Sequence, residues 1–175
     1  MEDLSLHILD IAENSVRAGA SLIQITIDED IEKDQLVIKM EDNGRGMRSE
    51  ELEKALNPFY TTKENKRVGL GLSLFSEAAR MAGGSLEIKT REKEGIQIQA
   101  IFQYSHIDRK PLGNINETLE TLIVGNPHVD FLYQYRKGEK VISLDTRQIR
   151  SGNEGGSYFS SNMIKMIRQI LNNKQ

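Results

Sequence analysis

A carboxylate, an amide and a cation recur along one predicted helix near the start of the chain. Asp10, Asn14 and Arg17 follow one another at the spacing that places side chains on one face of a helix. Mg²⁺ prefers oxygen ligands, and an asparagine supplies one without adding charge. This pattern predicts either a polar binding site or a partly solvated helix edge.

A second candidate site is the segment Asp42-Asn43-Gly44-Arg45-Gly46, which follows a predicted strand. Its two glycines let the backbone approach a ligand closely, because they carry no side chain. The carboxylate of Asp42 could accept a hydrogen bond from the exocyclic amine of a base. Asp-Asn-Gly is also a strong turn signal, so a plain turn is the alternative interpretation.

A third candidate, Gly69-Leu70-Gly71-Leu72-Ser73, opens a predicted helix. The free N–H groups and the dipole at the start of a helix favour an anion. Close packing is the alternative reason for two glycines at this place. The spacing is not that of a Walker P-loop, and the segment does not follow a strand as a Rossmann motif does.

Hydrophobic periodicity predicts the elements that position these segments. An apolar stripe indicates a first helix, and Gly19 is a natural cap at its end. Ile23, Ile25 and Ile27 alternate with polar residues, which is typical of a half-buried strand. In chain order we expect a helix over 4–18, strands over 21–28 and 36–41, a short helix capped by Ser49, a helix over 70–82, and strands over 85–90 and 96–104.

The order of these elements indicates the fold class. Strands and helices do not alternate strictly, so we expect an α+β sandwich with helices on one face of the sheet. A doubly wound parallel sheet is disfavoured for the same reason. Within the helix over 70–82, we expect Leu74, Phe75, Ala78 and either Met81 or Ala82 to face the core.

The last part of the chain is predicted to be a small α/β extension. Pro111 and Gly113 suggest a boundary, so we divide the chain into residues 1–105 and 106–175. The second part is expected to hold a helix over 115–124, a hairpin of 129–135 and 140–146, and an amphipathic helix over 161–173. That last helix is apolar around more than one face, which permits a homodimer; the alternative is packing on its own chain.

Composition narrows the function classes. The chain has 175 residues, of which 38% are hydrophobic and 28% charged, as in an ordinary globular domain. A net charge of −3 without a basic patch disfavours nucleic acid as a partner. The absence of cysteine excludes disulfides and thiolate metal sites. The acidic start and the lack of a long apolar run predict no signal peptide and no membrane span, hence a cytoplasmic protein.

Taken together, four segments in this order resemble the motifs of the Bergerat-fold ATPase superfamily, which includes histidine kinases, MutL and type II topoisomerases. The resemblance extends over residues 4–104. It is carried by Asn14-Ser15-Val16-Arg17-Ala18-Gly19-Ala20 (N box), Asp42-Asn43-Gly44-Arg45-Gly46-Met47 (G1 box), Asn57-Pro58-Phe59-Tyr60-Thr61-Thr62-Lys63 (F box of nitrogen-regulator-type kinases), and Arg67-Val68-Gly69-Leu70-Gly71-Leu72-Ser73 with the later Gly83-Gly84 (G2 box).

This resemblance implies a Bergerat-fold two-layer α/β sandwich with a mixed, largely antiparallel sheet, and ATP with Mg²⁺ as cofactors. It implies that Asn14 binds Mg²⁺, that Arg17 contacts phosphate, and that Asp42 binds the adenine amine. Asp10 stands at the position of the general base, which is usually Glu in the ATPase branches. One departure is Gly95-Ile96-Gln97-Ile98, where many kinases have Gly-Thr-x-Phe.

The remaining nucleotide-binding residues follow from the same resemblance. Gly44 and Gly46 would give room for the base. Residues 60–69 would form a lid over ATP. The other implied contacts are Thr62 and Lys63 near the phosphates, the N–H groups of Gly69 and Gly71 on the phosphates, and Leu70 and Leu72 in the same segment.

Three functions are compatible with these residues. The first is a signalling protein kinase that acts in trans on a partner protein, similar to the anti-sigma-factor serine kinases. We expect this mode because only three residues precede the first helix, which leaves no room for the upstream phosphoacceptor segment of histidine kinases. The second is a nucleotide-gated protein-binding module. The third is a slow ATPase in which Asp10 orients water. His7, on the first helix, is expected to be structural or on the surface.

Overall fold

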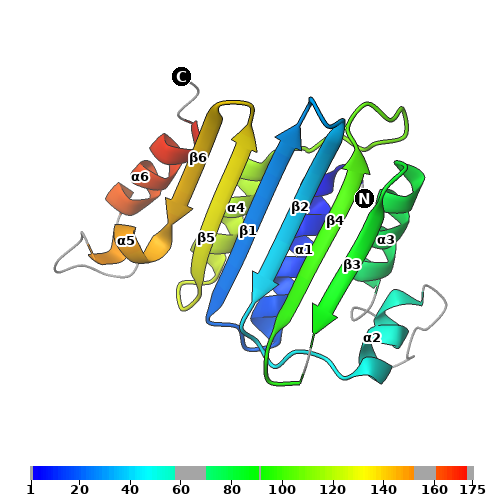
Figure 1. Cartoon of the computed structure of the whole chain (residues 1–175). Helices are drawn as coiled ribbons and strands as arrows, with labels where there is room; N and C mark the ends of the chain where they lie inside the picture. Colours follow the sequence, from blue (N-terminus) through cyan, green and yellow to red (C-terminus); the bar gives the residue numbers. More distant parts are fainter. Residues whose placement is uncertain (1, 58–69, 91, 152–160, 173–175) are drawn as a thin grey trace.

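One mixed sheet of six strands forms the centre of the protein (Figure 1). The computed structural model describes residues 2–57, 70–90, 92–151 and 161–172. The strand order is β3-β4-β2-β1-β5-β6. The strands are β1 (Leu22–Asp30), β2 (Gln35–Asp42), β3 (Ser85–Thr90), β4 (Ile96–Gln103), β5 (Asp130–Lys137) and β6 (Lys140–Asp145).

Helices cover one face of this sheet. Figure 1 shows α1, α3 and α4 behind the strands, and no labelled helix crosses the opposite face. The helices are α1 (Leu4–Arg17), α2 (Ser49–Leu56), α3 (Leu70–Met81), α4 (Ile115–Gly125), α5 (Thr146–Ser151) and α6 (Ser161–Asn172). The predicted α+β sandwich is therefore confirmed, and its sheet is antiparallel except for one strand pair.

The core lies between the helices and the covered face of the sheet. Ile23, Ile25 and Ile27 of β1 are buried, at most 1% exposed, and the residues between them are more exposed. This alternation confirms the predicted half-buried strand. β1 pairs with β2 in antiparallel fashion, and the pairing sets Asp42 opposite Ile23. Asp42 therefore lies at the end of the sheet where α1 finishes.

The predicted helix 70–82 exists as α3, with Ala82 rather than Met81 facing the core, and only Leu74 was assigned wrongly. Phe75, Ala78 and Ala82 are buried as expected. Leu74 is 44% exposed and Met81 is 51% exposed. The helical stripe that reaches the core is narrower than the apolar composition of this helix suggested, because α3 covers only the β3–β4 side of the sheet.

The structure confirms the predicted end of the first helix but not the predicted cap of the short helix. Gly19 has a φ of +79°, so it does follow the end of α1 in the left-handed region. Ser49 does not cap α2, because it is already the first helical residue and Arg48 is the cap. The backbone N–H of Arg48 donates to the carboxylate of Glu51 at 2.9 Å, which satisfies that end of the helix.

The C-terminal hairpin continues the same sheet. β5 runs parallel to β1 along its whole length, from Leu22 opposite Asp130 to Glu29 opposite Lys137. The predicted helices and hairpin of this region are confirmed as α4, β5, β6 and α6, whereas α5 was not predicted. α6 packs on α4 and β6 of its own chain. The division into residues 1–105 and 106–175 and the homodimer stay predictions. Among the described residues, no helix is long and apolar enough to cross a bilayer.

Candidate nucleotide-binding site

The carboxylate of Asp42 is held at the end of β2 by two hydrogen bonds. The Ser15 hydroxyl on α1 donates to Oδ2 at 2.5 Å. The backbone N–H of Gly44 donates to Oδ1 at 2.8 Å. Each carboxylate oxygen has more than one acceptor position, so both can still accept from a further donor. The side chain is thus fixed in direction while remaining able to bind.

The loop after Asp42 is fastened to the end of α1 and the start of β1. Asn43 Oδ1 accepts from the backbone N–H groups of Ser21 and Leu22, at 2.9 Å each. Its Nδ2 donates to the Ser21 hydroxyl at 2.8 Å. The N–H of Arg45 donates to the carbonyl of Ala18 at 3.1 Å. Asp-Asn-Gly therefore forms a turn and part of a built site, so its two interpretations do not exclude each other.

Gly95 brings the β3–β4 turn against this loop. Its φ is +80°, and a Cβ atom there would lie 1.9 Å from the carbonyl oxygen of Asp42. Thr90 joins the same contact, because its hydroxyl accepts from the N–H of Met47 at 2.9 Å and donates to the carbonyl of Gly95 at 2.8 Å. The backbone around Asp42 is packed from both sides.

A cavity of about 230 Å³ opens beside Asp42, and we call it the N-terminal cavity. Polar side chains from α1 and the loop after β2 form one part of its wall, and apolar side chains from β4, α2 and α3 form another. Such a combination suits a flat aromatic group with polar edges. The lining residues are Ile11, Asn14, Ser15, Arg17, Ala18, Asp42, Arg45, Gly46, Met47, Ala55, Leu72, Ile96 and Ile98.

Asn14 and Arg17 interact with each other on this wall. A guanidinium nitrogen of Arg17 donates to Asn14 Oδ1 at 2.5 Å. Another lies 3.6 Å from the Glu13 carboxylate. The helical spacing noted in the sequence therefore does bring the amide and the cation to one place. Both groups line the N-terminal cavity.

Asp10 lies one helical turn before Asn14 and touches the start of α3. A Cβ atom on Gly71 would lie 1.8 Å from Asp10 Oδ2 and 3.8 Å from Asn14 Nδ2. Only a glycine lets α3 begin this close to α1. Burial raises the pKa of the Asp10 carboxyl, while the charge of Arg17 opposes the rise. No group of three or more His, Cys, Asp or Glu residues within the described ranges could hold a metal ion.

The structure brings together most of the predicted site residues that it describes. Asn14, Arg17, Asp42, Gly46 and Leu72 line the N-terminal cavity. Gly44 donates to the Asp42 carboxylate, and Gly71 packs against Asp10 and Asn14, so these residues contact the lining without belonging to it. Leu70 is the first residue of α3. Thr62, Lys63 and Gly69 lie outside the described residues, so their assignment to the site stays a prediction.

Sequence reasoning missed several residues of the cavity. Ser15 orients Asp42, and its signal was a hydroxyl at a position of the apolar stripe, one turn after Ile11. Ile96 and Ile98 form the wall where many kinases have the Gly-Thr-x-Phe pattern. The departure noted in the sequence therefore places an apolar side chain, Ile96, at that point of the cavity.

Comparisons with known proteins show what the chain is similar to. The family model described as "Histidine kinase-, DNA gyrase B-, and HSP90-like ATPase" matches residues 2–106. Sporulation kinase D of Bacillus subtilis is 33% identical over 91 residues, which is 52% of this chain and 18% of that kinase. The aligned segments span 13% to 18% of the length of the first curated relatives.

Two solved structures share the fold over nearly the whole chain. The N-terminal domain of a DNA repair protein has a TM-score of 0.60 at 15% identity, covering 98% of this chain and 57% of that one. The Aquifex aeolicus MutL ATPase domain complexed with ADP has a TM-score of 0.55 at 18% identity, covering 97% of this chain and 70% of that one. At such identities the likeness concerns the fold alone.

Proposed function

The chain belongs to the histidine kinase-, DNA gyrase B- and HSP90-like ATPase family, and from this premise we propose that its N-terminal cavity binds Mg-ATP for a signalling kinase that acts in trans on a partner protein. The observation that carries the ATP proposal is the fixed carboxylate of Asp42. Its two internal donors, Ser15 and Gly44, leave acceptor positions for the amine of adenine. Ile96 and Ile98 provide an apolar wall for the base.

The phosphates would extend from the base toward α1 and the start of α3. Gly71 lets the first turn of α3 lie against Asp10 and Asn14, and free N–H groups at a helix start favour an anion. Mg²⁺ usually takes one or two protein oxygens and completes its shell with water and phosphate oxygens. The single amide oxygen of Asn14 fits that need, and Arg17 beside it would offset phosphate charge.

The kinase proposal rests on the family and on names of relatives such as sporulation kinase D. In phosphoryl transfer, the acceptor atom bonds to the γ-phosphorus and the bond to the β–γ bridging oxygen breaks, so that ADP leaves. The proton of the acceptor passes to a base. The raised pKa of Asp10 suits that role, and it equally suits a slow ATPase in which the acceptor is water.

Nucleotide binding is tested by calorimetry with Mg-ATP on the wild type and on Asp42→Asn. We expect the substitution to weaken binding about tenfold to hundredfold, because it replaces an acceptor of a charge-assisted hydrogen bond. Asp108→Asn, at an exposed position away from the cavity, is the control. Equal affinity of wild type and Asp42→Asn would refute the placement of the adenine.

Phosphate transfer is tested by adding γ-labelled ATP to the protein together with copurifying proteins. A trans kinase labels a partner, and no labelled acceptor would argue against this function. A slow ATPase instead releases phosphate without a partner and loses that activity in Asp10→Asn. A nucleotide-gated module binds its partner differently with ATP and with ADP, and continues to do so in Asp10→Asn.

A further inference from the structure

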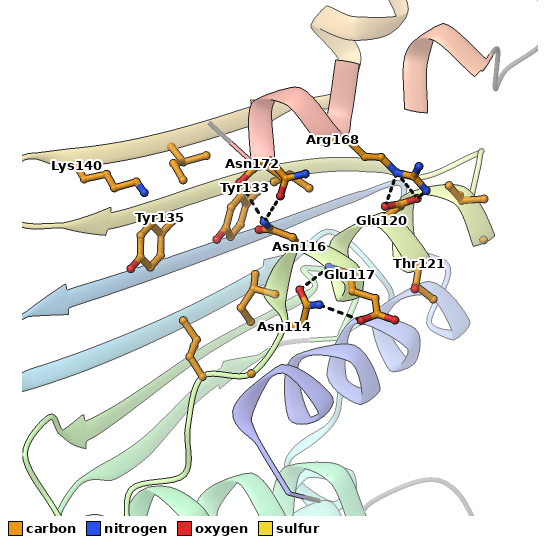
Figure 2. Close-up of a pocket in the computed structure, with 17 residues that line it drawn as sticks. Asn114, Asn116, Glu117, Glu120, Thr121, Tyr133, Tyr135, Lys140, Arg168 and Asn172 are labelled. Atoms are coloured by element: carbon orange, nitrogen blue, oxygen red, sulfur yellow. Dashed lines mark hydrogen bonds and ion pairs between the residues drawn. The ribbon is translucent and has the colours of Figure 1, made fainter. Parts of the chain in front are cut away.

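A second, more open depression lies outside the residues that the family model matches. It is a groove of about 1260 Å³ between α4, α6 and the β5–β6 hairpin, and we call it the C-terminal groove (Figure 2). Its lining includes the apolar residues Leu112, Ile115 and Ile142, which we call the apolar floor, together with polar and charged side chains. A groove of this size exceeds the usual range of small-molecule pockets, so it could hold an elongated ligand.

The walls of the groove are fastened to each other. Asn116 Nδ2 donates to the carbonyl of Leu171 and to Asn172 Oδ1, at 3.1 Å each. Arg168 of α6 forms an ion pair with Glu120 of α4. These contacts, drawn in Figure 2, fix the distance between α4 and α6. The groove is therefore a built feature of the packing.

One donor that lines the groove makes no hydrogen bond within the described part of the chain. Tyr133 is only 5% exposed, yet its hydroxyl makes no hydrogen bond to any residue that the structure describes. The neighbouring Tyr135 differs, because its hydroxyl donates to Glu29 at 2.6 Å. Burial raises the pKa of the Tyr133 phenol, so the hydroxyl keeps its proton. The hydroxyl faces the groove and is a donor that a bound acceptor can use.

A cation lies on the same side of the groove. Figure 2 shows Lys140 extending from β6 toward the side where Tyr133 and Tyr135 stand. Across the described ranges, Lys140 has no ion pair. The nearby carboxylates are engaged elsewhere, since Glu120 pairs with Arg168 and Glu117 accepts from Asn114 Nδ2 at 3.0 Å. Among the residues that the structure describes, neither the ammonium of Lys140 nor the hydroxyl of Tyr133 therefore has an acceptor, and both lie beside apolar lining residues.

We propose that the C-terminal groove binds an amphipathic organic anion. Its acidic group would lie between the ammonium of Lys140 and the hydroxyl of Tyr133, and its apolar body would cover Leu112, Ile115 and Ile142. A small inorganic anion would leave the apolar floor in water, and a neutral apolar molecule would leave both donors without an acceptor. The combination of the two features selects a molecule that has both parts.

The test uses the whole chain and the fluorescent anion 1-anilinonaphthalene-8-sulfonate as the probe. We expect saturable binding to one site, weakened about tenfold by Lys140→Gln and by Tyr133→Phe, since each removes one donor to a charged group. Lys165→Gln on the exposed side of α6 is the matched control and should leave the affinity unchanged. Decanoate should displace the probe much better than decanol does.

The Tyr133 variant also separates binding from folding. Because its hydroxyl makes no hydrogen bond to a described residue, Tyr133→Phe should unfold in urea at the same concentration as the wild type. The proposal is overturned by unchanged probe affinity in both Lys140→Gln and Tyr133→Phe, by equal competition from decanol and decanoate, or by absence of saturable binding. It is also overturned if Asp42→Asn abolishes probe binding, because the probe would then occupy the N-terminal cavity.

Discussion

The N-terminal cavity and the C-terminal groove occupy opposite halves of one sheet, and they differ in what forms their walls. The cavity, of about 230 Å³, is bounded by backbone turns and by short side chains such as Ser15 and Asp42 that bond to each other. The groove, of about 1260 Å³, is lined by side chains of α4, α6 and the β5–β6 hairpin, among them Tyr133, whose hydroxyl makes no hydrogen bond to a described residue. The cavity therefore holds its binding atoms in place by itself, whereas the groove leaves donors for a ligand to satisfy.

The strongest test of the rigid half is Gly95→Ala. The new Cβ would meet the backbone carbonyl of Asp42 at 1.9 Å and would also force a φ of +80° on an alanine. We expect the free energy of unfolding to fall by about 3 kcal/mol or more, from backbone strain and overpacking together. Urea unfolding measures it, and Mg-ATP affinity should fall as Asp42 is displaced.

Gly19→Ala is the matched control for this change. Gly19 has a φ of +79°, but a Cβ there would have no atom within 4 Å. Its cost is then backbone strain alone, about 1 kcal/mol. Equal losses in Gly19→Ala and Gly95→Ala would mean that the contact with Asp42 does not matter.

Low pH should reduce the free energy of unfolding through His7, which lies in the half of the molecule that holds the cavity. His7 on α1 is 1% exposed and packs on Phe75 of α3 with ring centroids 5.3 Å apart. Neither of its ring nitrogens has a hydrogen-bond partner among the described residues. Burial lowers its pKa to about 4, helped by the charge of Lys110 and opposed by Asp3. The folded protein therefore binds this proton less readily than the unfolded chain does.

This difference in proton binding makes the folded protein less stable as the pH falls. Stability from a neutral His7 is complete above the unfolded pKa of about 6.5 and is lost as the pH falls toward 4. Between pH 7 and pH 5 the loss is about 2 kcal/mol. Urea unfolding at both pH values should show a smaller loss in His7→Leu than in the wild type, with His128→Gln as the control at an exposed site. An unchanged loss in His7→Leu would contradict this assignment.

The smallest changes in unfolding free energy are expected on removal of one hydroxyl from each half of the molecule. Ser15→Ala removes a hydroxyl that donates to Asp42, and it should cost about 1–2 kcal/mol of unfolding free energy. Tyr133→Phe removes a hydroxyl without a described partner, and it should cost less than about 0.5 kcal/mol. Parallel urea titrations measure both. If Tyr133→Phe costs as much as Ser15→Ala, the proposed contrast between the two halves is wrong.

Most helices and strands could be predicted because their hydrophobic periodicity depends only on residues that are close in the sequence. The alternation of Ile23, Ile25 and Ile27 and the stripe of α1 depend only on neighbouring residues. The place of β5 could not be predicted, since its parallel pairing with β1 depends on contacts between distant parts of the chain. The exposure of Leu74 was missed for a similar reason: an apolar residue shows its type but not how far the sheet beneath it extends.

The two sites differ in the same respect. Asp42 and Gly71 stand in short motifs, because a turn and a helix start demand particular residues at fixed spacing. Ser15 shows only as one hydroxyl in an apolar stripe. Tyr133 and Lys140 carry no such signal, since a groove between whole elements places no demand on sequence spacing. Its residues become visible only when α4, α6 and the hairpin are placed together.

The parallel pairing of β5 with β1 has a consequence for the handling of this protein in solution. In a shortened chain that ended at residue 105, β1 would become the outer strand of the sheet, and the backbone N–H and C=O groups that pair with β5 along Leu22–Glu29 would be left without partners. Long unprotected edges of this kind pair with strands of other molecules and aggregate. The C-terminal hairpin thus protects the long edge of β1, and β6, with six residues against nine in β1, is the outer strand instead.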